Sequence, residues 1–341
     1  MMAPRSELID AFVKQHLMNA ELHPLAGDAS FRRYIRVKHP TGSYMLMDAP
    51  PEKEDVRPFV SVCNSLTDAG FSAPHIIGSD EAAGFLLLED LGDDTFSQLL
   101  RADIANEDEY YTAAVDMLAS WHMGALPVGA LPAYDTALLM REILLFPNWF
   151  LPQLLDGNAL AEAQQSYENL WQEILQSAPL EINQFVHRDY HADNLMWLPE
   201  RSGAQRVGLL DFQDAVAGDA AYDLVSLLED ARRDVPPVLA QKMLAHYLQK
   251  TGADAKRFSF AYALLAAQRN SKIVGIFTRL AARDGKQHYL DFLPRVWSHL
   301  VHDAEHPELG ALKEWLNRYV PQAARGRITI RKDAQALGLV A

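Results

Sequence analysis

The sequence predicts an α+β fold with two lobes, a small β-rich lobe over residues 1–91 and a larger, mostly helical lobe over residues 92–341. Before Gly92, short runs rich in aromatic and β-branched residues alternate with turn residues, which is typical of a β-sheet. After Gly92, helical periodicity dominates. Two apolar strands interrupt it, and each of them leads into acidic residues.

The small lobe is predicted to begin with an amphipathic helix over residues 6–18, with Ser6 as its N-cap. Three strands are then expected, at residues 22–25, 31–38 and 44–47. The turn residues at 39–42 make the second and third of these a hairpin. Another helix is expected to end at Gly70, because glycine favours the end of a helix. A buried strand at residues 85–88 completes the lobe.

The helical lobe begins with helices predicted from their periodicity at residues 95–100, 107–123, 136–155 and 158–176. Two apolar strands follow, ending near residues 186 and 210. Helical patterns then resume at residues 221–231, 238–251, 256–284 and 289–319, the third of which fits either one helix or two.

Composition narrows the classes of function. The chain has 341 residues, 49% of them hydrophobic, and a formal net charge of −14. Acidity of this size argues against nonspecific binding to nucleic acid or membranes. Cys63 is the single cysteine, which suits a reducing compartment. The most apolar stretch, residues 137–155, is interrupted by Arg141, Glu142 and two prolines. We therefore expect a cytoplasmic protein, and no protein partner follows from the sequence.

Four polar residues carry the main chemical signal. An apolar strand leads into His187 and Asp189, Asn194 follows five residues after Asp189, and a second apolar strand ends at Asp211. Phosphoryl transfer needs one carboxylate to take the proton of the acceptor hydroxyl, which fits Asp189. It also needs hard oxygen ligands for magnesium, which fits Asn194 and Asp211. We expect His187 to brace this catalytic loop. Singly, such residues are ordinary turn formers; together they favour phosphoryl transfer.

This motif resembles the aminoglycoside phosphotransferase and choline-kinase branch of the protein-kinase-like superfamily, which carries His-x-Asp-x-x-x-x-Asn and then a strand ending in Asp. The resemblance extends over the whole chain and implies a bilobal kinase-like fold with ATP and Mg²⁺ as cofactors. Other stretches are similar to the anomeric sugar kinases of bacterial cell-wall recycling, which phosphorylate C1 of N-acetylmuramate and N-acetylglucosamine. They are residues 27–34, 47–51, 211–215, 268–270, 272–277 and 283–286.

The resemblance also implies a nucleotide site. Gly27 and Ser30 would lie in the loop over the phosphates, although a plain hairpin turn explains them as well. Backbone groups at Glu89 and Leu91, in the hinge between the two lobes, would form hydrogen bonds with the edge of the adenine base. In some relatives this hinge also accepts guanine.

One departure from the family concerns the third strand, residues 44–48, which has no lysine for the phosphates. The nearby cations are Arg32, Arg33 and Lys53. Arg32 and Arg33 alternate across a strand, so only one of them can face the nucleotide. The sequence does not decide between them, and we carry Arg33 as the candidate. Glu54 is either the partner of such a cation or a solvated acid.

For the acceptor, Trp149 offers an aromatic platform for a sugar, with helix packing as the alternative. Asp214 is expected to contact substrate or a second magnesium, or else to cap a loop. Arg269 and Lys272 are candidates to pair with the lactyl carboxylate of N-acetylmuramate. Asp223, at the start of a helix, corresponds to an acid that holds the catalytic loop in relatives, so we expect a structural role.

Three functions fit these features. The first is an ATP- and Mg²⁺-dependent sugar 1-kinase acting on a small amino sugar. The second is an aminoglycoside antibiotic kinase. The third is a nucleotide-binding scaffold without catalysis, which the missing third-strand lysine favours and the complete set of Asp189, Asn194 and Asp211 opposes.

Overall fold

The computed structural model describes residues 4–25, 31–124 and 126–331. Contacts within the chain divide it into a first unit, Met1–Pro127 with Ala192–Ala215, and a second unit, Val128–His191 with Val216–Ala341. This division differs from the predicted lobes, because residues 92–127 and 192–215 both fold with the N-terminal part of the chain. The lobe boundary at residues 91–92 stays a prediction.

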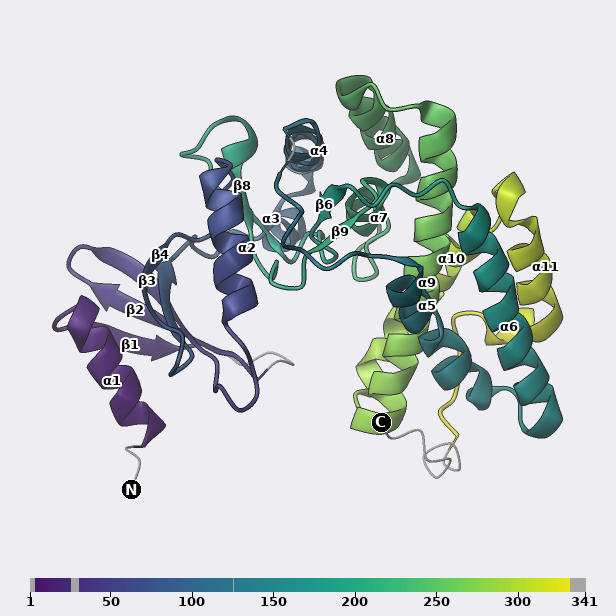
Figure 1. Cartoon of the computed structure of the whole chain (residues 1–341), viewed down its shortest axis with the longest axis horizontal. Helices are drawn as coiled ribbons and strands as arrows, with labels where there is room; N and C mark the ends of the chain where they lie inside the picture. The colour runs from purple at the N-terminus through teal and green to yellow at the C-terminus, as the bar shows by residue number, and fades with distance from the viewer. Residues whose placement is uncertain (1–3, 26–30, 125, 332–341) are drawn as a thin grey trace. The chain divides into compact units, whose positions relative to one another are not determined.

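The first unit contains a five-stranded antiparallel sheet (Figure 1). Its strand order is β1-β2-β3-β5-β4. The strands are β1 (Glu21–Pro24), β2 (Arg33–His39), β3 (Gly42–Asp48), β4 (Ile76–Asp80) and β5 (Phe85–Glu89). The predicted β2–β3 hairpin is confirmed, with His39 opposite Gly42. Only β4 was not predicted, because its short sequence lacks the alternation that marks the others.

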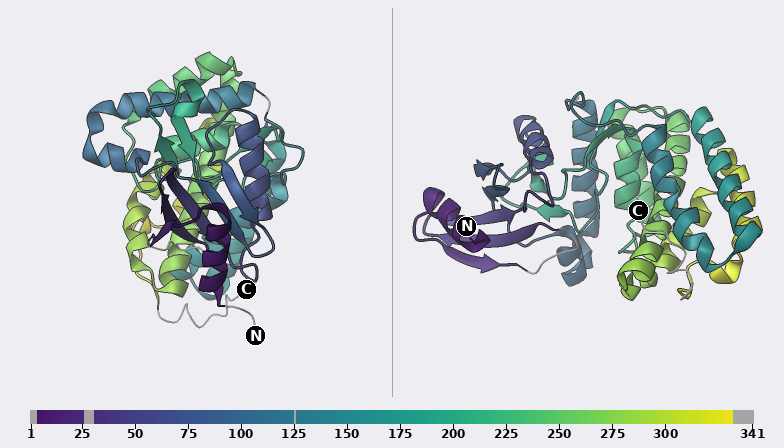
Figure 2. Two further views of the ribbon diagram at one scale, coloured as in Figure 1. Left: turned by 90° about the vertical axis from the view of Figure 1, so that its left-hand side faces the viewer. Right: turned by 60° about the horizontal axis from the view of Figure 1, so that its bottom comes forward.

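Helix α1 (Arg5–His16) lies against the sheet (Figures 1 and 2). Its buried side chains pack against apolar residues of β2, β3 and β5, and this cluster forms the core of the sheet region. The cluster includes Ile9, Phe12, Val13, Val37, Leu46, Phe85 and Leu87. Pro4 occupies the N-cap position, so the prediction that Ser6 caps this helix is wrong.

The rest of the first unit is α2 (Arg57–Asp68), α3 (Phe96–Ala102), η1 (Ile104–Asn106), α4 (Glu107–Met123) and an antiparallel hairpin. The hairpin joins β7 (Leu195–Trp197) to β8 (Val207–Leu209) across η4 (Gly203–Arg206). Gly70 follows α2 with a φ of +85°, a left-handed conformation that glycine adopts without steric cost. The predicted end of that helix is confirmed.

The second unit is mostly helical and holds one two-stranded sheet, β6 (Gln184–Val186) with β9 (Val216–Gly218). Its α-helices are α5 (Thr136–Ile143), α6 (Gly157–Ser177), α7 (Ala221–Leu228), α8 (Pro237–Thr251), α9 (Ala255–Asp284), α10 (Leu293–Asp303) and α11 (Gly310–Tyr319). Helix α9 is a single helix of 30 residues, which settles the choice between one helix and two (Figure 1). The helix predicted over residues 289–319 is divided by short 3₁₀ segments, η5 (Gln287–Phe292) before α10 and η6 (Pro307–Leu309) before α11. A further 3₁₀ segment, η7 (Gln322–Ala324), follows α11.

The helix predicted over residues 136–155 is broken. After α5 the chain forms a π-helix, η2 (Phe146–Phe150), and a 3₁₀ turn, η3 (Leu151–Gln153). Pro147 and Pro152 cause this, because proline has no N–H for the helical ladder. The broken segment meets α9 at Gly275, where an added Cβ would lie 2.4 Å from the carbonyl carbon of Leu145. Only glycine allows so close an approach.

A sheet in the N-terminal part and mostly helices after it confirm the predicted α+β fold. None of the helices in the described part of the chain is both long and apolar enough to span a bilayer.

Candidate active site

The predicted catalytic loop begins where β6 ends, and Asp223 holds it. The backbone N–H groups of His187 and Arg188 donate to the Asp223 carboxylate at 2.6 and 2.9 Å. Asp223 lies in the first turn of α7 and is fully buried. Its predicted structural role is confirmed. His187 is also fully buried, and its ring meets the edge of Tyr190 at 5.9 Å between ring centres.

Asp189 is held in its charged form. Burial acts to raise the pKa of its carboxyl, but electrostatic interactions with Lys272 first, and then with His191, Arg269 and His187, outweigh burial and lower the pKa below its usual range. The carboxylate can therefore accept a hydrogen bond, and then a proton, from a hydroxyl group at neutral pH.

Glu142 of α5 holds two of the cations in this region. Its Oε1 lies 3.0 Å from Lys272 Nζ and also pairs with the Arg188 guanidinium. Its Oε2 accepts hydrogen bonds from the Tyr134 hydroxyl and, at 3.3 Å, from Gln268 Nε2. Burial acts to raise the Glu142 pKa, but Lys272 and Arg188 bring it below its usual value. No local pattern marks Glu142 as part of the site, because its partners are distant along the chain.

The predicted acceptor residues of the second unit differ in their surroundings. Lys272 is mostly buried and paired with Glu142. Arg269 is 4% exposed and donates to the Glu229 carbonyl oxygen at 3.3 Å. Trp149 is half-buried in the π-helix, between the buried Phe146 and Phe150. Their roles toward an acceptor stay predictions, and burial makes Arg269 better suited to position the loop than to bind a ligand.

The predicted magnesium ligands lie at one end of the β7–β8 hairpin. Leu195 pairs with Leu209, and the next backbone bond runs from the Leu210 N–H to the Asn194 carbonyl oxygen at 3.0 Å. Asp211 follows directly, with a left-handed φ of +60° and a half-exposed side chain. Aspartate adopts this strained conformation more readily than most residues, and such outliers gather at functional sites.

Phe212 and Gln213 fix the surroundings of Asp211. The Phe212 ring is buried against Phe59 of α2, with 4.8 Å between ring centres. Gln213 Nε2 donates to Asp211 Oδ1 at 3.0 Å and to Asp214 Oδ2 at 3.4 Å. Asp214 is thus next to Asp211 and exposed, and its contact with substrate or metal stays a prediction.

The donor chemistry of this hairpin end fits magnesium. An amide oxygen and a carboxylate are hard ligands, and Mg²⁺ is commonly held by one or two protein groups that leave places for phosphate oxygens and water. Asn194 and Asp211 meet that description, and the half-exposed Asp211 side chain leaves room for a shared ion.

The cation beside this site is Arg32. Its Nη2 lies 3.9 Å from Asp211 Oδ1, and its Nε lies 3.9 Å from Glu54 Oε2. Arg33, by contrast, is 60% exposed and pairs with the buried Asp48 at the end of β3. The structure therefore favours Arg32 over Arg33 as the cation of the candidate site. It also favours the interpretation of Glu54 as an ion partner.

The predicted hinge follows β5. The Glu89 N–H donates to the His75 carbonyl oxygen at 2.8 Å, and the Glu89 carboxylate pairs with Arg201. The Glu89 amide is thus engaged, while Leu91 is half-buried one residue beyond Asp90. Their contacts with a base stay predictions. Gly27 and Ser30, predicted over the phosphates, lie outside the described residues.

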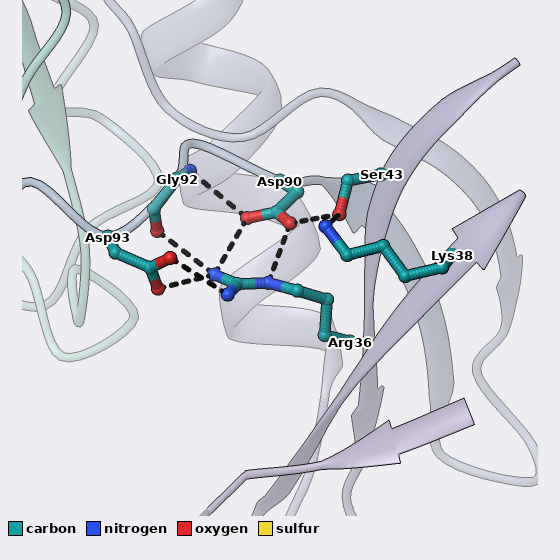
Figure 3. Close-up of polar contacts among 6 residues, drawn as sticks. All are labelled: Arg36, Lys38, Ser43, Asp90, Gly92 and Asp93. Carbon is teal, nitrogen blue, oxygen red and sulfur yellow. Dashed lines mark hydrogen bonds and ion pairs between the residues drawn. The ribbon is translucent and has the colours of Figure 1, made fainter. Parts of the chain in front are cut away.

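Arg36 of β2 clamps the segment after β5 (Figure 3). Its Nε lies 2.8 Å from Asp90 Oδ2, and its Nη2 lies 2.7 Å from Asp93 Oδ1 and donates to the Gly92 carbonyl oxygen at 3.2 Å. Ser43 of β3 donates to the same Asp90 carboxylate. Residues 90–93 are therefore tied to two strands of the sheet.

Asp223 gives the folded protein a pH dependence. Burial first, and then the charge of Asp189, raise its pKa to about 7, although two backbone N–H groups oppose this. The folded-state pKa exceeds the unfolded value, so the folded state binds this proton more tightly. The contribution of Asp223 to the free energy of unfolding is therefore largest below about pH 4 and is lost as the pH rises to 7. At about 1.4 kcal/mol per pKa unit, the loss is about 4 kcal/mol at most.

We expect Asp223→Asn to remove this slope. The measurement is the free energy of unfolding by urea at pH 4.5, 5.5, 6.5 and 7.5, for the wild type and the variant. Subtracting the two curves cancels the other titrating groups. Parallel curves would contradict the raised pKa.

Comparisons with known proteins agree with this geometry. Residues 21–260 match the phosphotransferase enzyme family. An N-acetylmuramate/N-acetylglucosamine kinase of Caulobacter vibrioides is 39% identical over 337 residues, which cover 88% of this chain and 92% of the relative. A protein of the same name from Pseudomonas aeruginosa is 39% identical over 313 residues, with coverage of 89% and 90%. The crystal structure of a choline kinase from Streptococcus pneumoniae matches with a TM-score of 0.60 at 13% identity, covering 90% of this chain and 99% of that one.

Proposed function

The chain belongs to the phosphotransferase enzyme family, and on that premise we propose that it is an ATP- and Mg²⁺-dependent kinase of the anomeric C1 hydroxyl of N-acetylmuramate and N-acetylglucosamine. The observation that carries the proposal is the charged Asp189, held on a loop fixed by Asp223. The Asn194 and Asp211 pair at the hairpin end supports it. The substrate class rests on the names of the curated relatives.

In this mechanism, Asp189 accepts a hydrogen bond from the C1 hydroxyl and turns its oxygen toward the γ-phosphate. As the new O–P bond forms, Asp189 takes the hydroxyl proton, the bond between the γ-phosphorus and the β–γ bridging oxygen breaks, and ADP leaves. Asn194 and Asp211 would hold the magnesium ion, which supplies charge neutralisation on the phosphates when bound. Arg32 adds positive charge beside Asp211, in place of the lysine that β3 lacks. We place the reaction in peptidoglycan recycling in the cytoplasm.

A kinase assay tests the proposal. The purified protein is mixed with ATP, Mg²⁺ and one acceptor, either N-acetylmuramate, N-acetylglucosamine or kanamycin, and ADP release is followed. We expect release with both amino sugars, none with kanamycin, and a ³¹P NMR signal that places the phosphate on C1. Release with kanamycin alone would identify an antibiotic kinase. Nucleotide binding without release in any mixture would support the scaffold.

Arg32→Ala should raise the KM for ATP about tenfold, because the variant loses a charge-assisted contact worth about 1.5 kcal/mol or more. Arg33→Ala is the matched control, since it removes the same side chain from the neighbouring position that faces Asp48. We expect the control to change KM less than twofold. Steady-state kinetics at saturating sugar give both values, and the reverse ranking would restore Arg33 as the nucleotide ligand.

A further inference from the structure

The guanidinium of Arg36 connects β2 to three residues of the segment that follows β5 (Figure 3). It meets both oxygens of Asp90, with Nε 2.8 Å from Oδ2 and Nη2 3.2 Å from Oδ1. It also donates to the Gly92 carbonyl oxygen at 3.2 Å and to the two Asp93 carboxylate oxygens at 2.7 and 3.0 Å. One side chain from another strand therefore holds the residues on both sides of Leu91.

The Asp90 carboxylate also acts on the backbone around Leu91. Asp90 Oδ1 accepts a hydrogen bond from the Gly92 N–H at 3.0 Å, which makes an Asx turn with Leu91 at its centre. Asp90 Oδ2 accepts from the Ser43 hydroxyl of β3, and the Asp90 side chain is only 4% exposed. Each oxygen thus has the Arg36 guanidinium and a second donor as partners. Bonds to a guanidinium are charge-assisted and strong, so the turn is firmly held.

The side chain and the backbone of Leu91 differ in their contacts. The side chain lies against β8, because a Cβ added at Gly208 would be 3.1 Å from Leu91 Cδ1. Leu91 is half-buried, yet among the described residues neither its N–H nor its carbonyl oxygen has a hydrogen-bond partner. Backbone groups away from solvent are nearly always paired. This donor and acceptor are therefore available to a ligand, unlike the Glu89 N–H, which donates to the His75 carbonyl oxygen.

We propose that Arg36 is a positioning residue for the nucleotide, which holds the N–H and the carbonyl oxygen of Leu91 in place for the edge of the adenine base. The inference rests on the proposed function and names the residue that sets affinity for the base. Adenine has a donor, its amino group, beside ring-nitrogen acceptors, so one N–H and one carbonyl group match it. Because Arg36 orders the turn beforehand, adenine binds without the cost of ordering it.

Calorimetric titration of the full chain in Mg²⁺ tests this role with three ligands: ATP, adenosine and tripolyphosphate. For Arg36→Ala we expect the Kd for ATP and for adenosine to rise about tenfold, because each must then order the turn. Tripolyphosphate has no base, and its Kd should stay near wild type. The KM for ATP should rise with the Kd, while kcat at saturating ATP should not change. Arg36→Lys, which can pair with Asp90 but lacks the fork, should recover part of the loss.

Arg5→Ala is the matched control. Arg5 of α1 also pairs with a buried aspartate, Asp48, at 2.6 Å, and also donates to a backbone carbonyl oxygen, that of Ala83, at 3.0 Å. Asp48 lies opposite Phe85, at the other end of β5 from the Arg36 contacts. The control should lower the midpoint of thermal unfolding as Arg36→Ala does, while all three Kd values stay near wild type.

An unchanged Kd for adenosine in Arg36→Ala would overturn the proposal. An equal rise for tripolyphosphate would also overturn it, in favour of a phosphate contact or a general loosening of the sheet. If Arg36→Ala does not fold, Arg36→Lys carries the same comparison with a smaller expected rise. Wild-type binding of ATP without ADP release from either amino sugar would refute the proposed function alone, because the three Kd values still decide the role of Arg36.

Discussion

Asp189→Asn should lower kcat for both amino sugars about 10³-fold, while ATP affinity stays near wild type. Asparagine keeps the size of the side chain but cannot take the proton of the C1 hydroxyl, and general-base catalysis contributes about 10²- to 10⁴-fold. The midpoint of thermal unfolding should fall somewhat, because the lowered pKa of Asp189 means that its charge stabilises the folded protein. ADP release gives kcat, and calorimetric titration gives nucleotide affinity.

Asp193→Asn provides the control within the same loop. It removes a carboxylate four residues further along the chain and should change kcat less than tenfold. If the two variants lost equal activity, the base could not be assigned to Asp189. If Asp189→Asn kept more than a tenth of the activity, the carboxylate would orient the sugar without taking its proton.

Glu142→Ala should lower the free energy of unfolding by about 3–5 kcal/mol, the usual cost of removing one partner from a buried ion pair. The variant leaves Lys272 and Arg188 in the interior without their shared counter-charge. It also removes the acceptor of the Tyr134 hydroxyl. Urea unfolding at pH 7 measures the effect. A loss below 1 kcal/mol would show that the cations find other partners.

A matched control for this variant is Glu162→Ala. Glu162 is exposed and accepts hydrogen bonds from Arg318 at 3.1 Å and from the Tyr319 hydroxyl at 2.9 Å. Exposed pairs of this kind contribute about 0–1 kcal/mol. We expect the two glutamate variants to differ clearly for that reason.

The Glu142→Gln variant distinguishes the effect of losing the Glu142 charge from the effect of losing its side-chain volume. Glutamine keeps the size of the side chain and can still accept from Tyr134, so its stability should lie between wild type and Glu142→Ala. Lys272 would no longer be anchored by an ion pair, and among the charges that lower the pKa of Asp189 its effect is the largest. The acidic limb of the kcat profile should therefore move to higher pH. An unchanged pH profile of kcat would show that Glu142 does not influence the pKa of Asp189.

The residues of the phosphoryl-transfer motif could be predicted because their signal is local. Asp189, Asn194 and Asp211 each follow or precede a short apolar strand, and strand ends expose polar side chains. Glu142 carries no such signal. It sits in an apolar helix 46 positions before Arg188. Its contacts exist only once the helices have packed.

The sequence offered Arg32, Arg33 and Lys53 as cations for the nucleotide, and the strand pattern could not choose between Arg32 and Arg33. Alternation shows that neighbours point to opposite faces. Which face meets Asp211 depends on the register that places Arg33 opposite Asp48. Similar reasons explain the elements that were missed. Strands β7 and β9 have three residues each, too few for a period to appear; β6 and β8 are equally short and were predicted because their apolar runs lead into the phosphoryl-transfer motif. Two prolines divided a segment whose apolar spacing alone resembled one helix.

Gly275 carries no charge, but its packing affects the ion pair between Lys272 and Glu142. It lies three residues after Lys272 on α9, and Leu145, whose backbone it meets, lies three residues after Glu142. The Lys272–Glu142 ion pair and the contact between Gly275 and the Leu145 backbone therefore lie next to each other where α9 meets α5 and the segment after it. A methyl group at position 275 would act as a wedge, widening the 3.0 Å gap between Lys272 Nζ and Glu142 Oε1 and weakening the field at Asp189. Volume at this position therefore tunes electrostatics at the base without any change in net charge.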